Sequence, residues 1–371
     1  MKYSIIVPVY NRPDEVDELL ESLSRQAFLD FEVIIVEDGS AIPCKTVCEK
    51  YAQKLNLKYY NKENSGPGQS RNYGVERANG EYVIILDSDV VLPDGYLLAV
   101  DNELKENPCD AFGGADASHP SFTPVQKAIS YSMTSFFTTG GIRGGKTSTA
   151  TSPSPSKGGE NTPQASKKNK KSKALDKFYP RSYNMGIRTE VYKKLGGFSK
   201  MRFGEDIDFS YRIVEAGYKS CLFTTAWVWH KRRTDLRKFF RQVYNSGIAR
   251  INLEKRHPGT MKLVHLLPMV FTVGVIGLIL ISMVGRLLMH YDDVHRWYWL
   301  CAAPWLPILL YSLLIFIDSS IQNRSIKIGG ISIAAAFVQL MGYGFGFLEA
   351  WWKRCVMKKD EFQAFEKTFY K

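Results

Sequence analysis

Apolar residues recur in two rhythms up to residue 225, and these rhythms predict strands that alternate with helices. Short apolar runs rich in β-branched residues predict buried strands. Apolar residues at i, i+3, i+4 and i+7 predict an amphipathic helix, and Val16, Leu19, Leu20 and Leu23 have that spacing. The predicted strands cover residues 4–9, 32–36, 58–61, 82–86 and 219–225, and the predicted helices cover residues 13–23, 46–55, 70–78, 192–195 and 206–216. This alternation predicts an α/β fold with a mainly parallel sheet and helices on both faces.

The predicted strand at residues 82–86 ends in two carboxylates, Asp87 and Asp89, separated by Ser88. Side chains at i and i+2 of a strand point to one face, so the carboxylates would lie together if the strand continued. Such oxygen ligands suit Mg²⁺ or Mn²⁺, and α/β sheets bind ligands at strand ends. A polar turn explains the same residues, because Asp and Ser are common turn formers. Spacing alone leaves both interpretations open.

Three long apolar runs follow residue 262, at residues 263–285, 297–317 and 328–348. Each is close to the roughly 20 residues that a helix needs to cross a bilayer. Aromatic residues stand near the ends of the runs, as they do at membrane interfaces. These residues are Trp297, Tyr298, Trp299, Trp351 and Trp352. The runs predict about three transmembrane helices, and buried core helices are the alternative.

Three crossings have a consequence for the basic C-terminal tail. If the N-terminal part lies in the cytoplasm, three spans place the tail outside, although Lys and Arg favour the cytoplasmic side. The residues concerned are Lys353, Arg354, Lys358 and Lys359. An arrangement in which one segment is re-entrant, or lies along the membrane surface, therefore stays open.

The chain is basic, with 49 Lys and Arg against 37 Asp and Glu and a formal net charge of +12. Much of the excess lies in residues 157–177 and 231–262, the latter directly before the first apolar run. This position favours a membrane surface over nucleic acid, for which no motif is present. The basic amphipathic stretch at residues 234–250 fits a solvated helix face or a membrane-surface helix. Cys44 and Cys48, one helical turn apart, fit a reduced pair in a cytosolic domain.

Residues 140–177 are rich in Gly, Ser, Thr, Pro and Lys and poor in apolar residues, which predicts a disordered insertion. Gly140 and the later run Gly145-Lys146-Thr147 match the phosphate-loop pattern. A phosphate loop opens a helix, and residues 148–156, with two prolines, do not provide one. We interpret the match as chance and do not predict a nucleoside triphosphatase.

Four motifs in order resemble the family 2 glycosyltransferases, and three later motifs add to the resemblance. The first four are residues 5–11 (IIVPVYN), 36–40 (VEDGS), 66–72 (GPGQSRN) and 87–89 (DSD). The later three are residues 184–186 (NMG), 196–198 (GGF) and 204–208 (GEDID). The resemblance covers residues 1–250 except the insertion. It implies an inverting enzyme with the GT-A fold, followed here by a basic juxtamembrane segment (251–262), the membrane helices (263–348) and a basic tail (349–371).

The resemblance implies a divalent metal, Mg²⁺ or Mn²⁺, that neutralises a leaving diphosphate. Asp89 is the foremost expected ligand, and Asp87 is expected to bind the metal or the ribose and sugar of the donor. His230 is a further candidate, because a histidine after the last strand binds metal in some relatives. A histidine packed among Trp227 and Trp229 is the alternative interpretation.

The same resemblance places the donor nucleoside at the mouth of the first strands. Pro8, Tyr10 and Asn11 are expected to line that pocket, with Asp38 facing the base or ribose. Arg71 is expected to meet the diphosphate or its acidic ligands, and a surface salt bridge is the alternative. Relatives often carry acidic residues where this chain has Arg12, and aspartate in place of Glu37. These departures leave a UDP-sugar and a GDP-sugar both open.

For the general base, the resemblance points to the acidic pair that opens the predicted helix at 206–216, and we choose Asp206. A carboxylate base fits a single displacement in which the acceptor hydroxyl loses its proton as it attacks. The positive helix start favours the ionised form of such a carboxylate. Glu205 and Asp208 are the alternatives, as ordinary acids of a first helical turn.

The expected function is an inverting, metal-assisted transfer from a nucleotide-sugar to a hydroxyl of a lipid-linked or cell-envelope glycan. The expected location is the cytoplasmic (inner) membrane, with the catalytic domain in the cytoplasm. Processive synthases usually carry Gln-x-x-Arg-Trp, and residues 242–246 read QVYNS, which favours single additions. The alternatives are a polyprenyl-phosphate glycosyltransferase and an inactive membrane scaffold that binds nucleotide-sugar.

Overall fold

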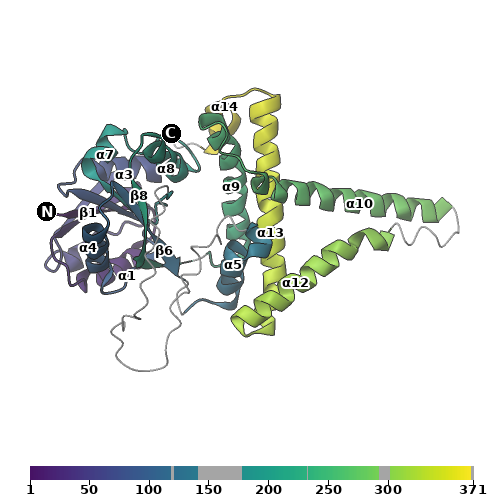
Figure 1. Ribbon diagram of the computed structural model, residues 1–371, viewed down its shortest axis with the longest axis horizontal. Coiled ribbons are helices and arrows are strands. Elements are labelled where there is room, and N and C mark those ends of the chain that lie inside the picture. The colour runs from purple at the N-terminus through teal and green to yellow at the C-terminus, as the bar shows by residue number, and fades with distance from the viewer. Residues whose placement is uncertain (118–120, 141–177, 232, 292–300, 369–371) are drawn as a thin grey trace. The chain divides into compact units, whose positions relative to one another are not determined.

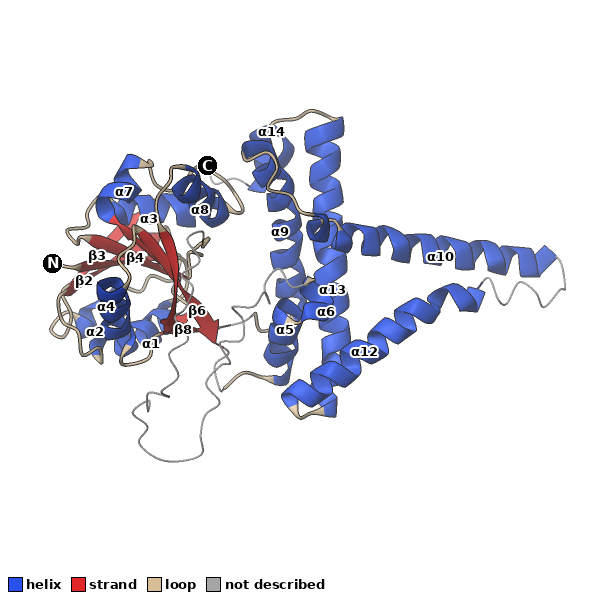
Figure 2. Ribbon diagram, in the orientation of Figure 1, coloured by secondary structure: helices blue, strands red, loops and turns tan. Residues whose placement is uncertain are grey.

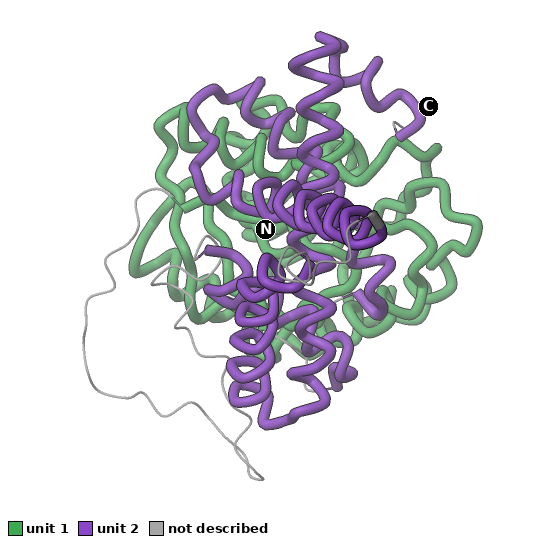
Figure 3. The backbone as a smooth tube through the Cα atoms, turned by 90° about the vertical axis from the view of Figure 1, so that its right-hand side faces the viewer, with its two compact units in different colours: residues 1–119, 149–231, 370–371 green, residues 120–148, 232–369 purple. Residues whose placement is uncertain are grey.

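The computed structural model describes residues 1–117, 121–140, 178–231, 233–291 and 301–368. Almost all of the predicted insertion lies outside these residues, and so do Trp297, Tyr298 and Trp299. The chain forms two compact units, which Figure 3 colours separately. Unit 1 contains residues 1–119 and 149–231 with 370–371, and unit 2 contains residues 120–148 and 232–369.

An eight-stranded mixed sheet forms the centre of unit 1, in the order β3-β2-β1-β4-β7-β6-β8-β5. The strands are β1 (Tyr3–Val9), β2 (Phe31–Asp38), β3 (Leu57–Lys62), β4 (Tyr82–Leu86), β5 (Val90–Val91), β6 (Ala111–Ala117), β7 (Asn184–Arg188) and β8 (Ser220–His230). Four of the seven strand pairings are parallel, and β7 is antiparallel to both of its neighbours. The parallel strands β1, β2 and β4 therefore end at one edge of the sheet.

Helices cover both faces of this sheet, which confirms the predicted fold class (Figure 2). Alternate residues of β1 serve the two faces: Ile5 and Val7 join one core, and Ile6 joins the other. The first core receives α1 (Pro13–Ser24), α2 (Lys45–Tyr51) and α4 (Tyr96–Glu106), and the second receives α3 (Pro67–Val75), α7 (Thr189–Lys194) and α8 (Glu205–Glu215).

The pattern did not predict α4, β5, β6 and β7. Strand β6 has the sequence AFGGADA, which is poor in strand-forming residues. It forms because β7 pairs with one side and β8 with the other. Close packing also requires the glycine of β7, since a Cβ atom at Gly186 would lie 1.9 Å from the ring of Phe112.

Unit 2 is helical (Figure 1). Its helices are α5 (Pro124–Thr134), α6 (Phe136–Thr139), α9 (Leu236–Arg256), α10 (Leu267–Tyr291), α12 (Leu306–Asn323), α13 (Ile326–Trp351) and α14 (Glu361–Phe365). Among the described residues, three helices are long and apolar enough to cross a membrane: Leu267–His290, Ala303–Asn323 and Ile326–Val356. Of the basic stretch predicted at residues 234–250, residues 236–250 belong to α9, and the apolar face of this helix is buried within unit 2.

Candidate active site

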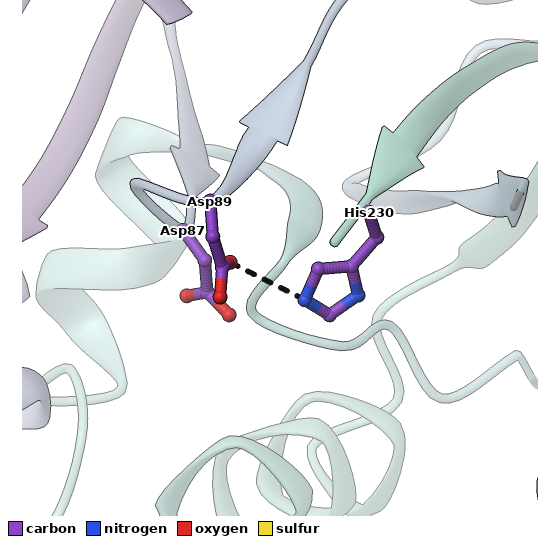
Figure 4. A group of neighbouring side chains, drawn as sticks. All are labelled: Asp87, Asp89 and His230. Carbon is purple, nitrogen blue, oxygen red and sulfur yellow. Dashed lines mark ion pairs between the residues drawn. The ribbon is translucent and has the colours of Figure 1, made fainter. Parts of the chain in front are cut away.

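The two aspartates of the DSD motif lie beside the predicted histidine, at the edge where β4 and β8 end (Figure 4). Asp87 and Asp89 flank the short turn between β4 and β5, and His230 is the last residue of β8. Pairing of β5 with β8 sets Val90 opposite His230, which brings the histidine to Asp89. One ligand atom from each of the three side chains lies within 4.8 Å of those of the other two. Carboxylate and imidazole ligands in this arrangement suit a divalent metal such as Mn²⁺.

Asp89 is buried and has a basic neighbour on each oxygen. Its Oδ1 lies 3.3 Å from His230 Nε2, and its Oδ2 accepts a hydrogen bond of 2.8 Å from Arg12 Nη1. Burial alone would raise the pKa of Asp89, but His230 and Arg12 outweigh burial and hold that pKa below its ordinary value. Asp89 is therefore a carboxylate at neutral pH. Arg12, which the sequence flagged only as a departure from the family pattern, is a neighbour of the site.

His230 is oriented by an aromatic ring other than those predicted. Its ring stacks on Tyr183 with centroids 5.0 Å apart, whereas Trp227 and Trp229 contact each other. On its other side, His230 Nδ1 lies 3.8 Å from Asp116 Oδ2. A carboxylate beside the second nitrogen favours a ring orientation in which Nε2 faces Asp89.

Arg71 connects Asp87 to the acidic helix start of α8. Its guanidinium is buried and donates to Asp87 Oδ1 at 2.8 Å, to Glu205 Oε1 at 3.0 Å and to Ser182 Oγ at 3.1 Å. We expected Arg71 to meet the diphosphate or its acidic ligands. In the structure it pairs with the acidic residues Asp87 and Glu205, and its guanidinium is buried, so these are not surface salt bridges. Burial and the charge of Asp206 raise the pKa of Glu205, although Arg71 opposes the shift.

The three acids at the start of α8 differ in their partners. Glu205 is held by Arg71, and Asp208 accepts from Ser199 at 2.7 Å and from Arg212 at 3.0 Å. Asp206 Oδ2 lies 3.0 Å from Arg181 Nε, and its Oδ1 accepts from the backbone of Ile207. Glu205 is thus tied to the buried Arg71, Asp208 to Arg212, whose side chain is 26% exposed, and Asp206 to Arg181, whose side chain is 38% exposed.

A tripeptide that the pattern did not flag contacts three of the site residues. Arg181 pairs with Asp206, Ser182 accepts from Arg71, and Tyr183 stacks on His230. These residues directly precede β7. Their spacing carries no motif, and a sequence signal for them would have required predicting β7 between β4 and β6.

The predicted donor pocket residues lie at the same edge, after β1 and β2. Tyr10 is 54% exposed, whereas Asn11 adopts a left-handed backbone (φ 54°) and links two loops. Its backbone N–H donates to Ser40 Oγ at 2.8 Å, and its side-chain oxygen accepts from Ile42 N at 2.9 Å. Pro8, near the end of β1, is partly exposed.

Asp38 and Glu37 both hold loops in place. Asp38 is buried and accepts from the backbone of Ser65 and of Gly66 at 2.9 Å each, and it pairs with Lys62. Glu37 accepts from Cys44 N at 2.8 Å and from Ser40 Oγ. The carboxylate of Asp38 is thus committed to the loop before α3, and contact with a base or ribose remains a prediction.

Comparison with known proteins identifies a family model, glycosyl transferase family 2, that matches residues 4–196. The poly(ribitol-phosphate) beta-N-acetylglucosaminyltransferase TarS of Staphylococcus aureus is 45% identical over 93 residues, which are 24% of this chain and 16% of that protein. The minor teichoic acid biosynthesis protein GgaB of Bacillus subtilis is 36% identical over 97 residues, 25% of this chain and 11% of that protein. These alignments therefore cover less than a fifth of each relative's length.

Among solved structures, the mannosyltransferase PcManGT of Pyrobaculum calidifontis, in complex with GDP-Man and Mn²⁺, is similar with a TM-score of 0.55. The similarity covers 91% of this chain and 87% of that one, at 15% sequence identity. At this identity the likeness concerns the fold.

Proposed function

Because this chain belongs to glycosyl transferase family 2, we propose that it transfers a sugar from a nucleotide-sugar to a hydroxyl of a cell-envelope or lipid-linked glycan. The gathering of Asp87, Asp89 and His230 at the sheet edge is the observation that carries the proposal. The names of the relatives TarS and GgaB support an acceptor of the cell envelope. The apolar helices of unit 2 support a membrane location. We place unit 1 in the cytoplasm as part of the same proposal.

The three gathered side chains fit a divalent metal on their own chemistry. Two carboxylates and one imidazole offer ligand atoms within 4.8 Å of one another, a donor set that Mn²⁺ and Mg²⁺ accept. Asp89 and His230 would hold the ion, with Asp87 as a further ligand or a contact for the donor. When bound, the ion supplies Lewis-acid stabilisation of the charge on the diphosphate leaving group.

The arginines of the site hold its carboxylates in place. Arg12 and Arg71 each donate to one oxygen of Asp89 and Asp87, respectively. Two neighbouring carboxylates repel each other, and the two ion pairs offset that repulsion. The same guanidinium groups provide positive charge where an anionic donor has to bind.

Asp206 is the proposed general base. It takes the proton of the acceptor hydroxyl as the oxygen attacks the anomeric carbon, and the bond to the diphosphate breaks in the same displacement. Its pairing with the partly exposed Arg181 supports this choice over Glu205, whose partner Arg71 is buried. The choice over Asp208 is supported because that carboxylate is itself buried and accepts from both Ser199 and Arg212. Pro8, Tyr10 and Asn11 are proposed to contact the nucleoside, and Asp38 to support that pocket.

The function can be tested with purified protein in detergent, by measuring nucleoside diphosphate release from UDP-, GDP- and dTDP-sugars. Each donor is measured with Mn²⁺ or Mg²⁺, with chelator, and with Asp89→Ala. Glu21→Ala, an exposed carboxylate on α1, is the matched control. Release from one donor that chelator and Asp89→Ala abolish supports the proposal. Because release can require the acceptor, donor binding is measured as well, and a protein that neither binds nor cleaves any donor would be a scaffold.

A further inference from the structure

The three apolar helices of unit 2 are alike in composition, but they differ in what covers them. In the most apolar window of α10 and of α12, 11% of the residues are buried, against 44% in α13. Helices α10 and α12 expose large apolar side chains such as Val273, Leu280, Leu309 and Leu313. Among residues 331–350 of α13, all of which the structure describes, only Ala334 is exposed. Helix α13 is thus covered by protein over most of its length.

Helix α9 provides much of that cover, and it lies against α13 at backbone distance. A Cβ atom on Gly247 of α9 would lie 2.2 Å from the carbonyl oxygen of Tyr343, and one on Gly346 would lie 2.0 Å from that of Tyr244. A Cβ atom on Gly342 would lie 2.7 Å from Val243. Phe240 of α9 lies against Gly342, and Gly247, farther along α9, lies against Phe347, farther along α13, so the two helices run side by side in the same direction (Figure 1).

Helix α9 cannot enter the hydrocarbon core of a bilayer. It contains seven charged residues, among them Arg241, inside the stretch from Phe240 to Gly247 that contacts α13, and Arg250, three residues beyond it. Arg and Lys in the middle of a membrane are costly and rare. If α13 crossed the bilayer, its glycine contacts would carry these charges of α9 across with it.

Helices α10 and α12 meet α13 at two places, and between them the rings of Phe271, Tyr311 and Phe337, one from each helix, pack together. On α10, Pro268 and Thr272 lie against Gly344, and on α12, Phe316 and Ser320 lie against Gly329. These glycines are fifteen residues apart, or about 22 Å along the helix axis. Farther from α13, the two helices approach each other, where Trp305 Nε1 donates to Ser282 Oγ at 2.8 Å. They therefore form a hairpin whose open end rests on α13, and Figure 1 shows α10 leading away from α9 and α13.

We propose that α10 and α12 alone cross the membrane, as a hairpin, and that α13 lies along the membrane surface on the side of the catalytic unit. With two crossings, residues before α10 and after α12 are on the same side. The basic tail then shares the side of the catalytic unit, and a cytoplasmic location of both satisfies the preference of Lys and Arg.

The surface formed by α9 and the end of α13 fits a lipid layer as its partner. A hollow between the two helices is lined by Phe240, Tyr244, Phe345, Leu348, Trp351 and Trp352, together with Glu349, whose carboxylate pairs with Lys353 at 2.6 Å. Trp351 and Trp352 are exposed and are followed directly by Lys353 and Arg354. Exposed tryptophan beside basic residues is the pattern of a helix held at the interface, with acyl chains under the aromatic rings and anionic headgroups near the charges.

The topology can be tested with cysteines, because the chain already carries a reporter. Cys355 is exposed four residues after the end of α13, Cys301 is partly buried, and the four cysteines of unit 1 are buried. In a Cys301→Ser background, a membrane-impermeant maleimide is applied to sealed vesicles before and after permeabilisation. Cys355 is compared with Ala27→Cys in unit 1 and His290→Cys at the far end of α10, both exposed positions, each combined with Cys355→Ser. Lys359→Cys, also with Cys355→Ser, is a second tail reporter.

We expect Cys355 and Lys359→Cys to react under the same conditions as Ala27→Cys, and His290→Cys under the opposite ones. Tail reporters that react together with His290→Cys show three crossings and overturn the proposal. Tail reporters that stay unreactive even after permeabilisation lie inside the bilayer and overturn it as well.

Discussion

The two ends of the parallel strands both carry buried carboxylates, and they hold them in opposite ways. At the end where the strands begin, Glu32 is surrounded by donors: Ser4 Oγ at 2.7 Å, Asn79 N at 2.8 Å and Lys58 Nζ at 2.8 Å. At the end where β4 stops, Asp87 and Asp89 lie close to each other and to His230. Glu32 links three segments of the fold through hydrogen bonds. The two aspartates instead bring negative charges close together, and Arg12, Arg71 and His230 lie beside them.

The difference shows that burial of an acid does not by itself mark a functional site. Glu32 and Asp89 both have a pKa below the ordinary value, and in both cases hydrogen bonds and cations outweigh burial. Asp89 differs from Glu32 in its neighbours, because a second carboxylate and an imidazole lie close enough to bind the same metal ion. The comparison predicts that changes at one end remove activity and leave stability, and that changes at the other end do the reverse.

The largest effect is expected for Asp206→Asn. The amide cannot accept the proton of the acceptor, so transfer should fall by about 10²–10⁴-fold, the contribution of a general base. Donor binding should stay near that of the wild type. The measurement compares transfer with equilibrium donor binding, with Asp14→Asn on α1 as a surface control.

Glu205→Gln decides between the two neighbouring acids. It removes the charge that pairs with Arg71, so we expect a loss of stability with some transfer retained. The opposite pattern, wild-type transfer in Asp206→Asn and none in Glu205→Gln, would assign the base to Glu205. Full transfer in both variants would favour an acceptor that is already ionised, such as a polyprenyl phosphate.

Asp89→Asn is expected to lower turnover by about 10²–10³-fold, as loss of one preorganised electrostatic group does. Chelator should lower wild-type turnover to a similar level and have little further effect on the variant. The matched control is Glu32→Gln at the other end of the sheet, which should retain turnover while folded. Equal losses of turnover in the two variants would contradict the comparison.

A smaller effect is expected for His230→Gln. If His230 is one of three metal ligands, its loss should raise the Mn²⁺ concentration for half-maximal turnover. We expect an increase of about 10–100-fold, the range seen when groups that support metal ligands are removed. Turnover at saturating Mn²⁺ should recover in large part. His290→Gln, at the exposed end of α10, controls for the substitution itself. An unchanged Mn²⁺ titration would leave His230 with a packing role against Tyr183.

The sequence predicted the parallel half of the sheet better than the rest. Strands β1 and β4 are continuous apolar runs, so the local pattern of apolar residues was enough to predict them. Strand β6 contains two glycines and an aspartate, and its partners come from distant parts of the chain. Local pattern does not contain that information, which is why Tyr183 and Asp116 were missed beside His230.

The same limit applies to the apolar helices. Residues 263–285 and 328–348 have similar length and hydropathy, and nothing local separates a helix covered by protein from one that faces lipid. The glycine contacts of α13 with α9 separate them, and these depend on the assembled unit. In the sequence, the only indication that one of the three apolar helices does not cross the membrane was that three crossings would place the basic tail outside.

Glu32→Gln is expected to have the smallest effect on turnover and a distinct effect on stability. Glutamine keeps the shape of the side chain, but its amide group cannot accept from both Lys58 and Asn79. The loss should be about 1.5–3 kcal/mol at neutral pH, the range for a hydrogen bond to a charged group.

Because the pKa of Glu32 is lowered in the folded protein, its contribution is present above the unfolded pKa and is lost as pH falls through the folded pKa. The stability difference between wild type and variant should therefore hold from about pH 7 to about pH 5 and shrink as the pH falls further. Equilibration in urea at each pH, followed by a hydrogen-exchange pulse at one fixed pH, measures protection in β2 separately from unit 2. A difference that stays constant or grows towards acid would show that the charge of Glu32 does not stabilise this edge of the sheet.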